Sequence, residues 1–198
     1  MPGIYTPSEG GALRQGELVT GLVQIKLALE LVDAETPDFQ IDQEAHPFAI
    51  VLSQDCDLEQ DWKARQSIIG PGFGPDVLHP TGASLPAILF AEVHDAKDLR
   101  GRVGASNIWQ RVRQNKDERY HFLETINSSE DATREGLPEL GIDFKRYFTL
   151  PTEEVYKRLE RSAQRRCRLT SPYLEHLSTR FCYYQFRVAL PLEHQSLP

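Results

Sequence analysis

The feature that most constrains the fold is an alternation of apolar and polar side chains over residues 17–32. Every second residue is apolar or glycine: Val19, Gly21, Val23, Ile25, Leu27, Leu29 and Leu31. A period of two is typical of a β-strand that buries one face. Because this segment exceeds the usual strand length of about 5–6 residues, we expect a bulge or a sharp bend at Gly21.

A second strand is predicted over residues 47–52, where a continuous apolar run follows a proline. The run ends in a cluster of small polar and ionisable side chains: Ser53, Gln54, Asp55, Cys56 and Asp57. We expect these side chains to lie in a loop at a sheet edge, where a rigid scaffold commonly supports functional groups. This cluster is the first candidate site of the chain.

Other segments predict a mixed architecture. Strands are expected over residues 87–93, 120–126 and 142–150, and helices over residues 107–115, from residue 152 through the basic run that ends at residue 168, and after residue 172. The last helix has an apolar stripe at intervals of three and four: Leu174, Leu177, Phe181, Tyr184 and Val188. Helical patterns do not alternate with strands, which disfavours parallel winding. We expect a mostly β or α+β fold, with a small, strongly bent sheet or partly open barrel covered by the last helix.

The predicted domain organisation is simple. Residues 1–16, rich in glycine, proline and serine, are expected to form a flexible arm, and residues 17–198 a single domain. Residues 70–86 contain four glycines and four prolines. Such a density predicts a long surface loop without regular structure.

Composition indicates a cytoplasmic protein with no membrane partner. No apolar run approaches the roughly 18 residues of a membrane span, and the first residues lack the basic and apolar regions of a secretion signal. The cysteines, Cys56, Cys167 and Cys182, are odd in number and widely spaced. This pattern favours free thiols in a reducing compartment over a disulfide framework.

Charge is unevenly distributed along the chain. Residues 1–61 carry twelve acidic and two basic side chains, whereas residues 62–198 carry 17 of the 29 acidic and 20 of the 22 basic ones. Residues 97–119 are the most basic part, with Trp109 and Tyr120 close by. Basic side chains interleaved with aromatic ones hold single-stranded nucleic acid by phosphate contact and stacking, which makes Arg111 and Arg113 candidate binding residues. A solvated helix face is the alternative.

A resemblance to a known family rests on two short motifs. Gly16-Glu17-Leu18-Val19 opens the first predicted strand, and His46-Pro47 leads into the second, which ends at Ser53. This arrangement resembles the start of MazF/PemK-like bacterial toxins. In that family, Gly-Asp opens the first strand and Arg-Pro leads into a strand that ends in Ser or Thr. The resemblance implies an SH3-like barrel with a C-terminal helix, here with insertions, and metal-independent cleavage of single-stranded RNA with Ser53 as catalytic residue.

The chain departs from the family at the site itself. His46 replaces the arginine that would hold a phosphate, and Asp55 and Asp57 would repel an RNA backbone. We therefore expect a non-catalytic regulatory or interaction module of this fold, related to toxin–antitoxin proteins. It would act through a protein partner in a bacterial stress or defence system. The polar residues after Ser53 would form the edge of the binding surface.

Two alternatives stay open. In the first, the chain is an endoribonuclease of the MazF/PemK type, in which Arg14 or Arg65 replaces the missing arginine beside Ser53. In the second, it is a nucleic-acid-binding module that uses Arg111 and Arg113 without catalysis.

Metal and thiol chemistry are weaker interpretations of the same cluster. Asp55, Cys56 and Asp57 with His46 or His79 would suit zinc, but no Cys-x-x-Cys or His-Glu-x-x-His spacing is present, and we predict neither metal nor cofactor. A nucleophilic Cys56 lacks a base in the sequence. In the structural interpretation, the carboxylates cap a turn and the thiol packs as a small apolar group. The other histidines are expected to be structural or exposed: His94, His121, His176 and His194.

Overall fold

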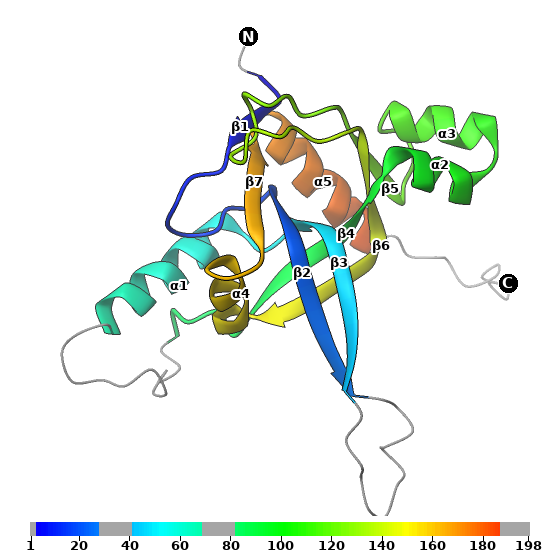
Figure 1. Cartoon of the computed structure of the whole chain (residues 1–198). Helices are drawn as coiled ribbons and strands as arrows, with labels where there is room; N and C mark the ends of the chain where they lie inside the picture. Colours follow the sequence, from blue (N-terminus) through cyan, green and yellow to red (C-terminus); the bar gives the residue numbers. More distant parts are fainter. Residues whose placement is uncertain (1–2, 28–40, 69–81, 187–198) are drawn as a thin grey trace, which may run out of the picture.

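The computed structural model describes residues 3–27, 41–68 and 82–186, which form a mixed α+β fold (Figure 1). Seven strands make one sheet in the order β1-β7-β2-β3-β4-β6-β5, and all its ladders are antiparallel. The strands are β1 (Tyr5–Pro7), β2 (Glu17–Leu27), β3 (Ile41–Val51), β4 (Ala87–Asp95), β5 (Tyr120–Leu123), β6 (Leu140–Pro151) and β7 (Gln164–Leu169). The helices are α1 (Asp55–Ile68), α2 (Ala96–Val103), α3 (Ser106–Arg113), α4 (Thr152–Leu159) and α5 (Tyr173–Gln185). The predicted α+β class without parallel winding is confirmed.

The sheet bends until its two edges approach one another. The hydroxyl group of Tyr5, in edge strand β1, donates a hydrogen bond of 3.0 Å to the carbonyl of Glu124, which directly follows the opposite edge strand β5. The described residues form no ladder between β1 and β5, so the sheet is open.

The long alternating strand is confirmed as β2, and residues 28–32 of the prediction lie outside the described residues. The register against β7 shifts between Leu18 and Val19, which places the bulge earlier than expected. Gly21 has a positive φ of 77°, and a Cβ atom there would lie 3.0 Å from the carbonyl oxygen of Ser162. Gly21 therefore allows the bend and the close approach of the segment after α4.

Helices cover both faces of the sheet. The apolar side of α5 packs on one face, where Leu177 is fully buried among β-strand residues such as Phe144. On the other face, α1 contributes Leu58 and α4 contributes Val155 to a second core around Phe90. A third, smaller core joins α2 and α3 to β5. Figure 1 shows α2 and α3 grouped at one end of the sheet, away from α1 and α4.

The prediction of a flexible arm is wrong for residues 3–16. Tyr5 pairs with Leu169 in the β1–β7 ladder, and Leu13 is fully buried in the second core. The backbone amide of Gln15 is also held, since it donates a 2.7 Å hydrogen bond to the Asp55 side chain. Glycine and proline content alone misleads here because long-range pairing with β7 orders the segment.

The helix predicted after residue 152 is much shorter than expected. α4 ends at Leu159, and the second half of the basic run forms β7 instead. Pairing with both β1 and β2 stabilises the extended chain, and two of its arginines form buried ion pairs. Local helix propensity is overridden by these tertiary contacts.

The predicted terminal helix is confirmed as α5. Its stripe of Leu174, Leu177, Phe181 and Tyr184 packs on the first core, and Val188 lies outside the described residues. Most of the predicted loop at residues 70–86 also lies outside them. None of the described helices has the length and apolar character needed to cross a membrane.

Candidate functional site

The predicted cluster after β3 starts a helix instead of forming a loop. α1 begins at Asp55, so Asp55, Cys56 and Asp57 occupy its first turn, and Ser53 and Gln54 lie directly before it. Ser53 Oγ accepts a 2.9 Å hydrogen bond from the amide of Leu89, and Asp55 Oδ1 accepts one from Gln15. These two side chains therefore join neighbouring segments and are already engaged.

The remaining members of the cluster lie at the surface. Gln54, Cys56 and Asp57 are exposed, and Cys56 Sγ lies 3.7 Å from Gln54 Oε1 and 3.5 Å from Asp57 Oδ1. No described histidine contacts the thiol, so a Cys–His nucleophilic pair is not formed among the described residues. The arginines expected beside Ser53 have other partners: Arg14 contacts Glu59 at 3.4 Å and Arg65 contacts Asp61 at 2.6 Å.

The structure brings a different set of ionisable groups together on β3, β4, β6 and α2. We call this set the Glu92 cluster: His46, Glu92, His94, Arg102 and Arg146. Glu92 Oε1 lies 3.5 Å from His46 Nδ1, and Glu92 Oε2 lies 3.5 Å from His94 Nε2. Arg146 Nη1 donates a 3.3 Å hydrogen bond to the same Oε2. Arg102 Nη1 lies 3.5 Å from His94 Nε2.

An irregularity in β6 helps to place the cluster. Ala91 pairs with Tyr147, but the next residue of β4, Glu92, pairs with Asp143. Residues 144–146 therefore form an insertion without partners on β4, and Arg146 belongs to it. Bulges of this kind redirect side chains and are common beside active sites.

The two imidazoles of the cluster favour the neutral form. Burial lowers the pKa of His46 below its usual value of 6.5, although the charge of Glu92 opposes this shift. Burial also lowers the pKa of His94, and the charge of Arg102 adds to the effect. The His46 ring stacks on Phe148 with centroids 3.7 Å apart, and its Nε2 has no hydrogen-bond partner. His46 is thus fixed beneath the cluster.

The cluster opens to solvent through two adjoining hollows. One of about 360 Å³ is lined by the histidines, Glu92, both arginines and three further carboxylates, Glu44, Asp95 and Asp98. The other, of about 480 Å³, lies on the side of Phe148. The side chains of Glu92 and His94 are 15% and 14% exposed, whereas that of His46 is 2% exposed. A small ligand or one unit of a polymer could therefore contact Glu92 and His94, whereas His46 borders both hollows with almost no exposed surface.

These groups suit acid–base chemistry. A carboxylate can accept a proton, an imidazole can donate one, and two guanidinium groups can stabilise negative charge. Among residues 3–27, 41–68 and 82–186, no group of three or more histidine, cysteine or acidic side chains is arranged to hold a metal ion. Glu92 and His94, whose Oε2 and Nε2 atoms lie 3.5 Å apart, are close enough to exchange a proton.

Sequence reasoning missed most of this cluster. It singled out His46 through the family resemblance but interpreted His94 as structural or exposed, and it did not consider Glu92 or Arg146. Glu92 and Arg146 are 54 residues apart and meet only through the β4–β6 ladder. No local spacing could reveal that pairing.

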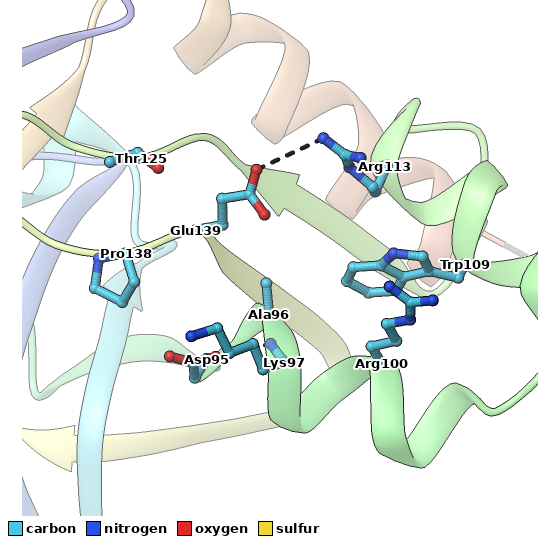
Figure 2. A pocket seen from close by; sticks show the side chains of 9 residues that line it. All are labelled: Asp95, Ala96, Lys97, Arg100, Trp109, Arg113, Thr125, Pro138 and Glu139. Carbon is cyan, nitrogen blue, oxygen red and sulfur yellow. Dashed lines mark hydrogen bonds and ion pairs between the residues drawn. The ribbon is translucent and has the colours of Figure 1, made fainter.

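Arg111 and Arg113 lie in α3, an element that contains neither Ser53 nor any member of the Glu92 cluster. Arg111 donates a 3.4 Å hydrogen bond to the carbonyl of Lys116. Arg113 lies 3.6 Å from Glu139 and over the ring of Phe122. Of the two, only Arg113 lines a hollow beside α2, shown in Figure 2.

Compared with models of protein families, with curated proteins and with solved structures, the chain matches none.

Proposed function

We propose that the chain is a metal-independent endoribonuclease whose reactive centre is the Glu92 cluster. The observation that carries the proposal is the placement of a carboxylate, an imidazole and two guanidinium groups around one solvent-accessible point of the sheet. The resemblance to MazF/PemK-like toxins supplies single-stranded RNA as substrate. In the same proposal, the bent, open sheet with α5 across one face is a variant of the SH3-like barrel.

The proposed reaction uses the 2′-hydroxyl of the substrate as nucleophile. Glu92 accepts its proton, and the 2′-oxygen forms a bond to the adjacent phosphorus. The bond from phosphorus to the 5′-oxygen breaks, and His94 in its imidazolium form donates a proton to that oxygen. The products are a 2′,3′-cyclic phosphate and a 5′-hydroxyl end.

Two arginines of the cluster can take the role of the family's arginine, which is replaced by His46 in this chain. Arg102 and Arg146 lie within 3.5 Å of His94 and Glu92 respectively, so either guanidinium group can stabilise charge on a phosphate held there. His46, buried under Phe148, is a positioning residue that holds Glu92. Ser53 has no role in this reaction, because its hydroxyl is engaged by Leu89.

Cleavage of a mixed-sequence single-stranded RNA in the presence of a chelator tests the proposal. We expect RNA to be cut and DNA of the same sequence to stay intact, because DNA lacks the nucleophile. Glu92→Gln should lower kcat/KM by about 10²- to 10⁴-fold. Glu153→Gln is the matched control, since Glu153 lies in α4, lines neither hollow of the cluster and pairs with Lys157. Equal cleavage by Glu92→Gln and the unaltered protein would overturn the proposal.

Ser53→Ala distinguishes the Glu92 cluster from the site implied by the family. We expect this variant to cleave RNA at the normal rate and to unfold somewhat more easily, since it loses the hydrogen bond from Leu89. Loss of cleavage without loss of stability would move the reactive centre to Ser53.

A non-catalytic module acting through a protein partner is the second candidate. The observation that favours it is the exposure of Gln54, just before α1, and of Cys56 and Asp57 on its first turn, apart from the Glu92 cluster. If no RNA is cleaved and a specific protein co-purifies with the chain but not with an Asp57→Lys variant, this candidate replaces the nuclease. A role in bacterial stress or defence and a cytoplasmic location remain predictions under both candidates.

A further inference from the structure

A third hollow lies on the other side of α2 from the Glu92 cluster. It has a volume of about 330 Å³ and lies between α2, α3 and the connection from β5 to β6 (Figure 2). Asp98 and Arg102 of α2 line the hollow of the Glu92 cluster, whereas Lys97 and Arg100 line this one. Charged side chains of α2 therefore line both hollows.

Trp109 is the centre of this surface. It lines the hollow of Figure 2 and an adjoining one of about 470 Å³, and Arg100 and Arg113 also line both. The indole meets the ring of Phe122 nearly at a right angle, with centroids 6.1 Å apart. No described aromatic ring is stacked parallel to the indole, and the side chain is only partly buried.

The cations around Trp109 are available to a ligand. Within the described part of the chain, Lys97 and Arg100 form no ion pair, and Arg113 contacts Glu139 through side chains that are 56% and 45% exposed. An exposed pair of this kind contributes little and exchanges readily. Residues 96–116 carry six basic side chains and one acidic one, in a chain of net charge −7.

The acidic residues of the lining do not cancel this charge. Asp95 accepts a 2.7 Å hydrogen bond from the amide of Lys97 as the N-cap of α2. Glu139 faces Arg113 (Figure 2). Asp95 thus has a backbone partner, and Glu139 competes with a phosphate for Arg113 alone. Lys97 and Arg100 are the cations of this lining that form no ion pair among the described residues.

We propose that the surface formed by Lys97, Arg100, Trp109 and Arg113, here called the Trp109 groove, binds single-stranded RNA beside the Glu92 cluster. One base stacks on the indole, and the phosphates on either side contact the arginines. A base within a duplex is already stacked and paired, so this arrangement selects unpaired strands. The choice of RNA rests on the proposed function, whereas single-strand binding by the groove does not.

The groove also gives the nuclease a means of positioning its substrate. α2 is two turns long and separates the two hollows, so a strand bound at Trp109 can continue over the helix to Glu92. A base held at Trp109 then fixes which phosphate reaches the Glu92 cluster. Trp109 is in this sense a candidate specificity residue.

Fluorescence anisotropy with a labelled, mixed-sequence DNA single strand tests the groove without any cleavage. We expect Trp109→Ala to raise the Kd by roughly 5- to 150-fold, the effect of losing one stacked base. Tyr183→Ala, at a 63% exposed aromatic residue of α5, should leave the Kd unchanged. A DNA duplex should bind the unaltered protein more weakly than the single strand does.

Charge variants give a second readout that does not depend on removing a packed ring. For Arg100→Ala together with Arg113→Ala, the slope of log Kd against log salt concentration should fall by about 1.4, the loss of two phosphate contacts on a single strand. Arg161→Ala, at an exposed arginine beyond α4, is the control and should keep the slope. Thermal unfolding of every variant verifies that the fold is retained.

The outcomes separate the groove from the nuclease. Unchanged Kd for Trp109→Ala, an unchanged salt slope for the double variant, or equal affinity for duplex would each overturn the groove. If the groove fails these tests while the unaltered chain cleaves RNA, the Glu92 proposal stands alone. If the groove binds as expected and no RNA is cleaved, the nuclease fails and single-strand binding remains.

Discussion

Arg165 and Arg166 are neighbours in β7, and each reaches a different buried carboxylate. Arg165 donates to both oxygens of Glu17 at 2.5 and 2.8 Å. Arg166 donates to both oxygens of Asp131 at 2.9 and 2.7 Å, and this pair is almost completely buried. A basic run that suggests a solvated helix face in the sequence thus supplies two internal ion pairs. Each side chain's role depends on a partner distant in sequence.

Breaking the Arg166–Asp131 pair should be costly. Arg166→Met leaves Asp131 charged and buried without its partner, so we expect the free energy of unfolding to fall by about 3–5 kcal/mol. Urea unfolding followed by circular dichroism measures the change. Arg161→Ala, at an exposed position, should stay within about 0.5 kcal/mol. A loss below about 1 kcal/mol for Arg166→Met would show that water reaches Asp131 and replaces the arginine.

The pH dependence of cleavage should reveal the proposed acid. Burial and the nearby charge of Arg102 lower the pKa of His94 below 6.5, so the imidazolium form becomes scarce as the pH rises. We therefore expect kcat/KM to decrease with increasing pH, starting below pH 6.5. His94→Gln should lose most of the activity, and its remaining activity should not show this descending limb of the pH profile. His176→Gln, at an exposed histidine of α5, should keep the limb. A rate that is constant from pH 5 to 8 would exclude His94 as the acid.

At the scale of elements, α5 shows how a local pattern and a long-range contact combine. The stripe at intervals of three and four identifies its apolar face, and that face packs across strands from both halves of the chain. Phe181 lies 5.6 Å from the ring of Phe144, while Arg180 donates to the carbonyl groups of Asp117 and Tyr120. The helix therefore covers the core and also holds the segment that leads into β5.

Truncation of the buried residue of α5 tests the packing. Leu177 is fully buried, so Leu177→Ala should lower the free energy of unfolding by about 2–5 kcal/mol through lost contacts and a cavity. Tyr183→Ala on the exposed side of the same helix should change it by less than about 0.5 kcal/mol. Equal effects of the two substitutions in chemical unfolding would mean that α5 does not seal the core.

His121, in β5 beneath α5, should make the molecule acid-sensitive. Burial lowers the pKa of His121 to about 3, and the nearby charge of Arg180 and the ring of His176 act in the same direction. The neutral ring of His121 makes its full contribution to the free energy of unfolding above pH 6.5, the ordinary pKa of histidine. That contribution is lost progressively as the pH falls below 6.5. At pH 5 the loss from this residue is about 2 kcal/mol.

His121→Leu is the variant that isolates this effect. We expect its free energy of unfolding to fall less between pH 7 and pH 5 than that of the unaltered protein, as measured by urea titrations at each pH. His46→Leu controls for the other buried imidazole, whose pKa is also lowered by burial. Parallel curves for His121→Leu and the unaltered protein would mean that His121 is not the sensitive group.

At the scale of the whole molecule, the sequence predicts what local periodicity controls. Alternation identifies β2, and the stripe identifies α5, because both patterns repeat within one element. Prediction from the sequence fails for β7, for the ordered structure of residues 3–16 and for the Glu92 cluster. These depend on which strands become neighbours, and a single sequence contains no direct sign of strand pairing. The polar residues after β3 were misinterpreted because the same side chains serve equally well as a reactive cluster and as the first turn of a helix.

Hollows lie on either side of α2, and we predict that RNA binding and RNA cleavage take place in different ones. If the Trp109 groove binds and the Glu92 cluster cleaves, each function should be lost separately. Glu92→Gln should bind single-stranded RNA with the Kd of the unaltered protein but cleave it about 10²- to 10⁴-fold more slowly. Trp109→Ala should raise KM by roughly 5- to 150-fold and keep kcat at saturating substrate, because stacking at Trp109 persists unchanged from the bound substrate to the transition state.

Steady-state cleavage and anisotropy measured on the same two variants distinguish this division from a single combined site. A fall in kcat for Trp109→Ala at unchanged KM would place Trp109 in the chemical step. Loss of binding in Glu92→Gln would place the Glu92 cluster in ground-state recognition. Either result would contradict separate roles and require α2 to be part of one continuous site.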